Sequence, residues 1–203
     1  MTDAAPFKGH LPLTADVLER LFVGARSQHR FTAREVSHAT LRALYDLARL
    51  APTAFNSQPA RFTFLSSAAS RERLTPALSS RNREKTLAAP VTAIVAYDVR
   101  FHERLPQLWP SADVQSFFTA SPELAQQTAE RNAFLQAAYF ILAGRALGLT
   151  AGPMSGFKSE LVDAEFFPEG RYRSLLLVNL GYVEPAESPR PPRLEFDQAA
   201  QIL

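Results

Sequence analysis

Glycines at a regular spacing mark one stretch of the chain that could carry chemistry. Four of the eight glycines recur every four residues, and these are Gly144, Gly148, Gly152 and Gly156. Gly144 and Gly148 fit close helix packing followed by a helix stop. Gly152 and Gly156 lie beyond that helix, in a predicted loop where backbone amides can approach a ligand without side-chain hindrance. Gly152 and Gly156 are therefore better functional candidates than Gly144 and Gly148.

Two other segments combine polar groups in a way that could bind a ligand. Residues 26–31 read Arg-Ser-Gln-His-Arg-Phe and place three possible cations and a hydroxyl before a predicted helix. This pattern is compatible with an anion site, and equally with a solvated basic cluster. Residues 51–59 pack two prolines and several small polar groups between a helix and a strand. That segment is either a capped turn or part of a site.

Several common kinds of active site are excluded by the residues themselves. There is no Gly-x-Gly-x-x-Gly and no phosphate-binding loop motif. Residues 152–156 resemble a nucleophile elbow, but their glycines and serine have the wrong spacing. The chain has no cysteine, and its four histidines are scattered, which argues against thiolate and metal catalysis. No acid–base pair or Ser-His-Asp set is visible.

Length and composition are those of a soluble globular protein. The 203 residues are 46% hydrophobic and carry a formal net charge of +2, too little to indicate a nucleic-acid partner. No apolar run approaches the ~18 residues that a membrane span needs. Residues 1–24 lack the basic, apolar and small-residue order of a signal peptide, so we expect a cytoplasmic protein without a membrane partner.

The elements that must position these segments follow from hydrophobic periodicity. Residues 1–13 are predicted to form a mobile arm, and 14–203 a single α+β domain. Residues 99–121 lack a steady period and are predicted to form a lid-like excursion. The helix at 121–147 is apolar nearly all round in its second half, which marks a core or subunit-interface helix. Helices are further predicted at 14–23, 35–50 and 70–78, and strands at 60–65, 91–97 and 174–183.

Taken together, these segments resemble the FMN-dependent nitroreductase family over about residues 15–203. The order of motifs carries the resemblance: Arg26-Ser27, the 51–59 segment, Asn82 with Lys85, the 146–157 segment and a late Arg193. Residues 73–80, 89–96 and 152–157 look closest to the branch of malonic semialdehyde reductases. The resemblance implies a mostly antiparallel sheet flanked by helices. It also implies a homodimer with FMN held in the subunit interface.

The resemblance assigns a role to each group of candidate residues. The phosphate and ribityl chain of FMN would meet Arg26, Ser27 and His29, with Arg190 and Arg193 closing on the phosphate. The pyrimidine edge of the flavin ring would face Asn82 and Lys85. One ring face would lie along Pro153, Met154, Ser155 and Gly156, with a backbone N–H offered to flavin N5. The other subunit would contribute Pro52, Thr53 and Asn56.

Three positions depart from the family pattern. Ala25 stands where a second arginine is frequent, His29 replaces a usual lysine or arginine, and Ala60 replaces a common tryptophan. We therefore expect phosphate contacts that are either weaker than in the family or more dependent on Arg190.

The activity implied is an FMN-dependent NAD(P)H oxidoreductase with NADH or NADPH as hydride donor. Donor and acceptor would use the flavin in turn, in a ping-pong scheme. The acceptor would be a small carbonyl compound, malonic semialdehyde giving 3-hydroxypropanoate, or a nitro compound. The alternative is a protein that binds flavin without turnover. A flavin carries the hydride chemistry itself, which accounts for the lack of an acid–base set.

Overall fold

The computed structural model describes residues 13–27, 30–183 and 189–203 of the chain. The predicted arm at 1–13 therefore lies outside the described residues, apart from an exposed Leu13. His29 also lies outside them. The remaining predictions can be compared with the structure element by element.

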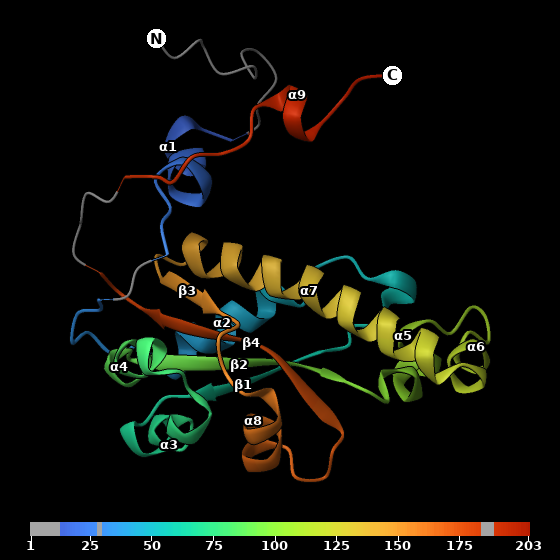
Figure 1. The fold of residues 1–203 in the computed structure, drawn as a ribbon. Coiled ribbons are helices and arrows are strands. Elements are labelled where there is room, and N and C mark those ends of the chain that lie inside the picture. The colour runs from blue at the N-terminus through green and yellow to red at the C-terminus, as the bar shows by residue number, and fades with distance from the viewer. Residues whose placement is uncertain (1–12, 28–29, 184–188) are drawn as a thin grey trace.

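One four-stranded antiparallel sheet forms the centre of the molecule (Figure 1). Its order is β1-β2-β4-β3, so β2 and β4 are the inner strands. Every residue of β2 is buried, as its continuous apolar run predicts for a strand covered on both faces. The strands are β1 (Ala60–Leu65), β2 (Val91–Asp98), β3 (Thr150–Met154) and β4 (Tyr172–Gly181).

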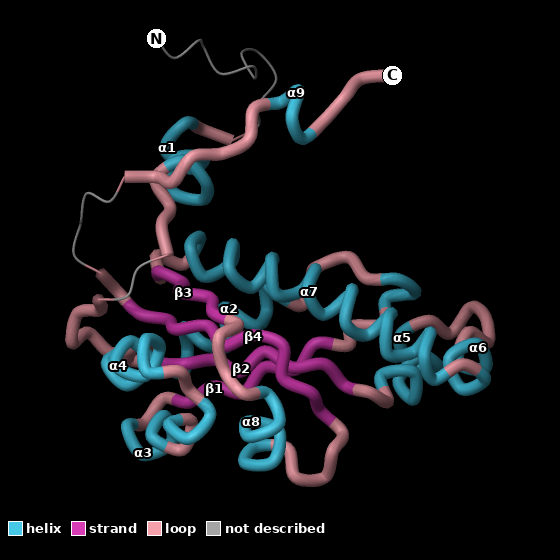
Figure 2. Tube along the Cα trace, in the orientation of Figure 1, coloured by secondary structure: helices cyan, strands magenta, loops and turns pink. Residues whose placement is uncertain are grey.

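Helices cover both faces of this sheet (Figure 2). On one face, α2 (His38–Ala48) and α7 (Pro122–Ala146) pack on side chains such as Val95 of β2 and Val178 of β4. On the other face, α8 (Ser159–Phe166) packs on Ile94 and Leu177. Leu74 and Ala77, which follow the short helix α3 (Ala68–Glu72), belong to the same cluster. Alternate residues of one strand thus serve two cores. The predicted α+β fold, with its antiparallel sheet and long helix, is confirmed.

The long helix α7 begins and ends where its capping residues predict. Ser121 precedes it and accepts a hydrogen bond from the Leu124 amide, Pro122 is its first residue, and Glu123 lies in the first turn. After α7, Gly148 adopts a φ of +80°, a left-handed conformation that strongly favours glycine and stops the helix.

The segment predicted as a lid-like excursion contains short helices, and several of its side chains are buried. Phe101, Leu105, Val114 and Phe118 form a third cluster with the first half of α7. The sequence shows no steady hydrophobic period here because each helix is too short to repeat its buried positions. A lid function for this segment stays a prediction. The helical pieces are a 3₁₀ turn (Phe101–Arg104), α5 (Leu105–Leu108) and α6 (Gln115–Ala120).

One prediction about local structure was wrong, and two helices were missed. Residues 152–154 belong to strand β3, where we expected a loop. They form a strand because they pair with residues 177–179 of β4, and Pro153 does not prevent this pairing. Asn82 and Lys85 lie on a nine-residue helix, α4 (Ser80–Ala88), which the periodicity did not indicate because its buried face is nearly restricted to Thr86. Helix α8 was also missed.

The remaining elements are short. The predicted helix at 14–23 is α1 (Ala15–Leu18) continued by a π-helical turn (Glu19–Val23), and the one at 70–78 is α3 followed by a 3₁₀ turn (Thr75–Ala77). A 3₁₀ turn (Ala54–Asn56) precedes β1, and α9 (Phe196–Ala199) lies near the C-terminus. In Figure 1, α1 and the C-terminal segment lie together, away from the sheet. No helix in the described part of the chain is long and apolar enough to cross a membrane.

Replacing Phe140 by alanine should destabilise the fold strongly. Its fully buried ring stacks on Phe62 at a centroid distance of 4.8 Å, so truncation removes apolar contact and leaves a cavity. We expect Phe140→Ala to lower the free energy of unfolding by about 3–5 kcal/mol, measured by urea denaturation. The control Phe117→Ala, at a ring that is 59% exposed, should change it far less. Equal effects of the two variants would contradict this packing.

Candidate functional site

Asn82 and Gly156 meet although they lie 74 residues apart in the sequence. The Asn82 side-chain amide on α4 donates a hydrogen bond to the Gly156 carbonyl at 3.0 Å. A Cβ at Gly156 would lie 2.9 Å from Asn82 Nδ2, so the end of the Asn82 side chain would have to move. Gly156 does not have a positive φ, so its constraint is this close approach and not a left-handed backbone.

Further contacts fix the segment after β3 against α4 and the turn before it. The Lys158 amide donates to the Ala77 carbonyl at 2.8 Å, and the Thr86 hydroxyl lies 3.7 Å from the sulfur of Met154. Pro153 and Met154 are half-buried, whereas Ser155 and Gly156 are exposed. The backbone at 155–156 is thus held firmly and yet remains open to a ligand.

Lys85 lies on the same helix as Asn82 and is half-buried. Within the described residues it has no hydrogen bond or ion pair with an acidic group. An ammonium that is partly removed from water attracts an anionic or carbonyl-rich ligand more strongly than an exposed one. Asn82 and Lys85 together offer a donor and a cation beside the exposed Ser155–Gly156 backbone.

A second group of residues gathers at the end of the π-helical turn that follows α1. Arg26 donates to the carbonyls of Val23 and Ala25 at 2.8 and 3.0 Å. Arg190, from the C-terminal segment, donates to the same two carbonyls at 2.7 and 3.1 Å. The negative end of a helix stabilises such cations. Two candidate phosphate-binding arginines are therefore brought together, with the exposed Ser27 beside them.

Arg145 joins this arginine cluster and was missed from the sequence. Near the end of α7, it donates to the Leu21 carbonyl at 2.8 Å. Burial, and secondly the charge of Arg190, lower the pKa of Arg145. The available signal was a single cation in the last turn of an otherwise apolar half-helix. With three guanidinium groups, the cluster can attract an anion.

The Pro52–Pro59 loop has a strained backbone. Phe55, Asn56 and Gln58 have φ values of 53°, 49° and 42°, a left-handed conformation that costs roughly 1–2 kcal/mol per residue. Asn56 donates to the Leu108 carbonyl at 3.1 Å and accepts from Gln58. The loop is thus an ordered structure whose shape the surroundings impose.

This loop is not joined to the Asn82–Gly156 pair within one chain. Among the described residues, no hydrogen bond links Thr53 or Asn56 to α4 or to the segment after β3. Pro52 and Asn56 are exposed, and Thr53 is half-buried. The residues predicted to come from another subunit are therefore accessible to one.

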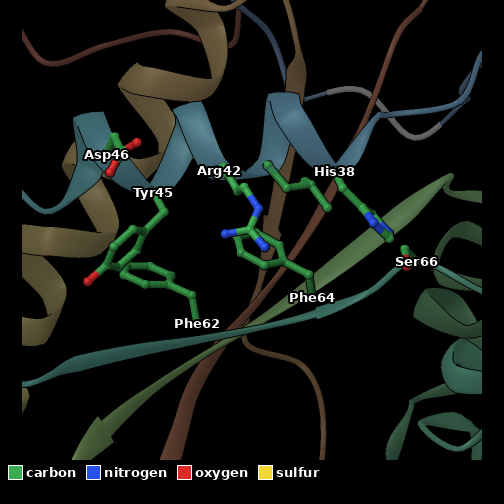
Figure 3. A pocket seen from close by; sticks show the side chains of 8 residues that line it. His38, Arg42, Tyr45, Asp46, Phe62, Phe64 and Ser66 are labelled. Carbon is green, nitrogen blue, oxygen red and sulfur yellow. The ribbon is translucent and has the colours of Figure 1, made fainter.

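A cavity of about 540 Å³ lies elsewhere, between α2 and the edge strand β1. Figure 3 shows Arg42 and Tyr45 of α2 directed toward Phe62 and Phe64 of β1. The Tyr45 and Phe62 rings meet edge to face at 6.3 Å. None of its lining residues belongs to the predicted site. The cavity is therefore separate from the candidate site.

Comparison with known proteins identifies the family. The sequence profile of the "Nitroreductase family" matches residues 23–182. The chain belongs to the nitroreductase family. A Rhodopseudomonas palustris protein, provisionally named an NADH dehydrogenase/NAD(P)H nitroreductase, is 51% identical, covering 92% of this chain and 95% of that protein. A Xanthomonas oryzae pv. oryzae protein with the same provisional name is 54% identical, covering 94% of this chain and 97% of its own.

Solved structures show the same nitroreductase fold. One is a provisionally assigned nitroreductase from Exiguobacterium sibiricum, solved in complex with FMN. Its TM-score is 0.78 at 21% identity, and the match covers 93% of this chain and 97% of that one. At this identity the likeness establishes the shared fold.

The structure brings most of the candidate residues together in three groups, and Arg193 lies apart from them. Arg193 is exposed and donates to the nearby Pro191 and Pro192 carbonyls, at 2.9 and 3.1 Å. In this conformation its hydrogen bonds stay within the C-terminal segment. The three groups are the Asn82–Lys85 helix with residues 153–156, the Arg26–Arg190 cluster with Ser27, and the Pro52–Asn56 loop.

Proposed function

We propose that this protein binds FMN and is an NAD(P)H-dependent oxidoreductase. The observation that carries the proposal is the hydrogen bond between Asn82 and Gly156, which joins the two segments assigned by resemblance to the flavin ring. An exposed backbone stretch beside a half-buried lysine suits a planar ring with a carbonyl-rich edge. The main test is the visible absorption spectrum of the purified protein, which should show bound flavin.

The residues present fit FMN in both charge and shape. Asn82 and Lys85 would face the pyrimidine edge, and Pro153 to Gly156 would lie along one face of the ring. The arginine cluster, with Ser27, suits the phosphate, and guanidinium groups match phosphate geometry well. Arg193 and His29 remain candidates for the same phosphate.

When bound, FMN supplies hydride transfer at N5, used in turn by NADH or NADPH and by the acceptor. The chain's own task is to bind and orient the ring and to keep water away from it. The names of the two curated relatives, which mention NAD(P)H, support the choice of donor.

For the acceptor we propose a small carbonyl compound, malonic semialdehyde being reduced to 3-hydroxypropanoate. The resemblance of residues 73–80, 89–96 and 152–157 to that branch supports it. The names of the relatives instead favour a nitro compound. Measuring kcat/KM for malonic semialdehyde and for a nitroaromatic compound with the same enzyme decides between them.

A flavin-binding protein without turnover is the alternative. Both functions require the same binding residues, so the test must measure reduction and reoxidation of the flavin. In the enzyme, NAD(P)H bleaches the flavin absorbance rapidly, and the added acceptor restores it. A flavin that binds but stays oxidised with both nicotinamides supports the alternative.

We further propose a homodimer with each FMN site built from both chains. The second half of α7 leaves Phe134, Leu135 and Tyr139 more than 40% exposed, opposite the face buried on the sheet. Apolar side chains gathered in this way mark an interaction surface. A second copy covering α7 would also supply the accessible Pro52–Asn56 loop to the partner's flavin.

The protein should have twice its 22.5 kDa chain mass in solution, measured by light scattering. Leu135→Arg should weaken the dimer and FMN binding together, because it buries an unpaired charge in the interface. Leu161→Arg on α8, at a leucine that is 39% exposed, is the matched control and should leave both intact. A monomer that still binds FMN would contradict the shared site.

Gly156→Val should abolish normal FMN binding. The new side chain would displace Asn82 and would crowd the backbone proposed to run along the ring. FMN titration of the flavin-free protein, followed by flavin fluorescence, measures the loss. The control is Gly144→Ala, whose Cβ would lie 3.9 Å from its nearest neighbours. Stoichiometric FMN in Gly156→Val would show that this glycine only turns the chain.

Lys85→Gln should lower the flavin reduction potential by tens of millivolts. Reduction adds negative charge on the N1–C2 carbonyl side of the ring, which a nearby ammonium stabilises by roughly 1–3 kcal/mol. About 1.4 kcal/mol corresponds to 30 mV for a two-electron couple. Reduction by NAD(P)H should slow, while FMN affinity changes less because the phosphate contacts lie elsewhere.

The potential is measured by dye-linked reductive titration. Lys158→Gln, at an exposed lysine outside the proposed site, is the matched control and should keep the parent potential. An unchanged potential and reduction rate in Lys85→Gln would make Lys85 an ordinary surface residue.

A further inference from the structure

Two buried amide side chains on α7 hold the two ends of the strained loop before β1. Asn132 accepts a hydrogen bond from the Ala54 amide at 2.8 Å. One helical turn later, Gln136 accepts from the Ala60 amide at 2.9 Å. The two side chains are 7% and 2% exposed. The loop is therefore attached to the helix at its beginning and at its end.

These amides stand on a face of α7 that is otherwise apolar. Their neighbours on this face include Ala129, Ala133 and Ala137, all buried. A buried amide is costly unless it is hydrogen-bonded. Asn132 is held on both sides, since its Nδ2 also donates to the Thr128 carbonyl at 2.8 Å. Its carbonyl oxygen is thus fixed in direction before it meets the loop.

The loop itself depends on outside support for its shape. Three of its residues have left-handed backbone conformations, and the Phe55 ring packs edge to face on Trp109 and Phe118. Thr53 accepts from the Gln58 amide across the loop at 3.2 Å. Without the two anchors on α7, this strained backbone would be free to relax to a commoner conformation.

The same helix also carries the exposed Phe134 and Leu135, which lie between the two amides in sequence and on the opposite face. In the proposed dimer, that face meets the partner. One side of α7 would then contact the second subunit while its other side sets the position of the loop.

We propose that Asn132 and Gln136 are positioning residues of the flavin site. They fix the loop relative to α7, so that Pro52 and Thr53 reach the flavin of the partner subunit in a set geometry. This inference rests on the proposed function. Their own atoms act on the loop backbone, and the flavin is affected through it.

The test compares variants that remove or keep the anchoring oxygens. Gln136→Met and Asn132→Leu keep side-chain size but lose the acceptor. Gln127→Met, an exposed glutamine on the same helix, is the matched control. Three quantities are measured: the FMN dissociation constant, the visible circular dichroism of bound flavin, and amide hydrogen exchange at 52–60 in flavin-free protein.

We expect both acceptor-free variants to raise the FMN dissociation constant about tenfold, alter the flavin dichroism and speed exchange at 52–60. Gln127→Met should match the parent. If Gln136→Met does not fold, Asn132→Ser, which replaces the amide by a shorter hydroxyl side chain, decides by the same criteria.

The inference is overturned if the acceptor-free variants melt at lower temperature but keep the parent's FMN affinity and dichroism. The two residues would then stabilise the fold alone. A parent protein that binds no FMN contradicts the proposed function itself. A parent that binds FMN as tightly as its variants contradicts only the positioning role.

Discussion

The packing of α7 across the sheet is the contact on which the rest of the structure depends. Phe140 is fully buried and stacks on Phe62, while Ala137 and Ala143 let the helix lie close to β2 and β4. Because α7 is long, its first half also covers the 99–121 segment through Ala125 and Ala129. The burial of one helix thus joins two of the three cores, while Phe134, Leu135 and Tyr139 of the same helix stay exposed.

Polar groups on the same helix link the core to the candidate site. Asn132 and Gln136 reach the loop before β1, and Arg145 reaches the carbonyls at the end of the π-helical turn. Each of these bonds satisfies a group that burial would otherwise leave costly. The helix therefore positions two of the three groups of candidate residues. The third, Asn82 and Lys85 with residues 153–156, is positioned by α4 and by the end of β3 on the sheet edge.

The division of the site into these groups agrees with a cofactor that does its own chemistry. The residues that gather are donors, cations and open backbone, which bind and orient a ligand. Such an arrangement suits a large ligand with an anionic end and a planar end, as proposed for FMN. None of the residues that line the separate cavity between α2 and β1 belongs to the predicted site.

The sequence by itself determined the strands at 60–65 and 91–97, the helix at 121–147 with its caps, and the family to which the chain belongs. Each rests on signals local in sequence: periodicity, a Ser-Pro-Glu start, a glycine stop and ordered motifs. Only the tertiary structure decided that residues 152–154 form a strand, because that depends on pairing with β4, and that Asn82 meets Gly156. The same holds for Arg145, Asn132 and Gln136. Their importance comes from backbone groups far away in the chain, and a pattern along one helix cannot show which distant amide or carbonyl will need a partner.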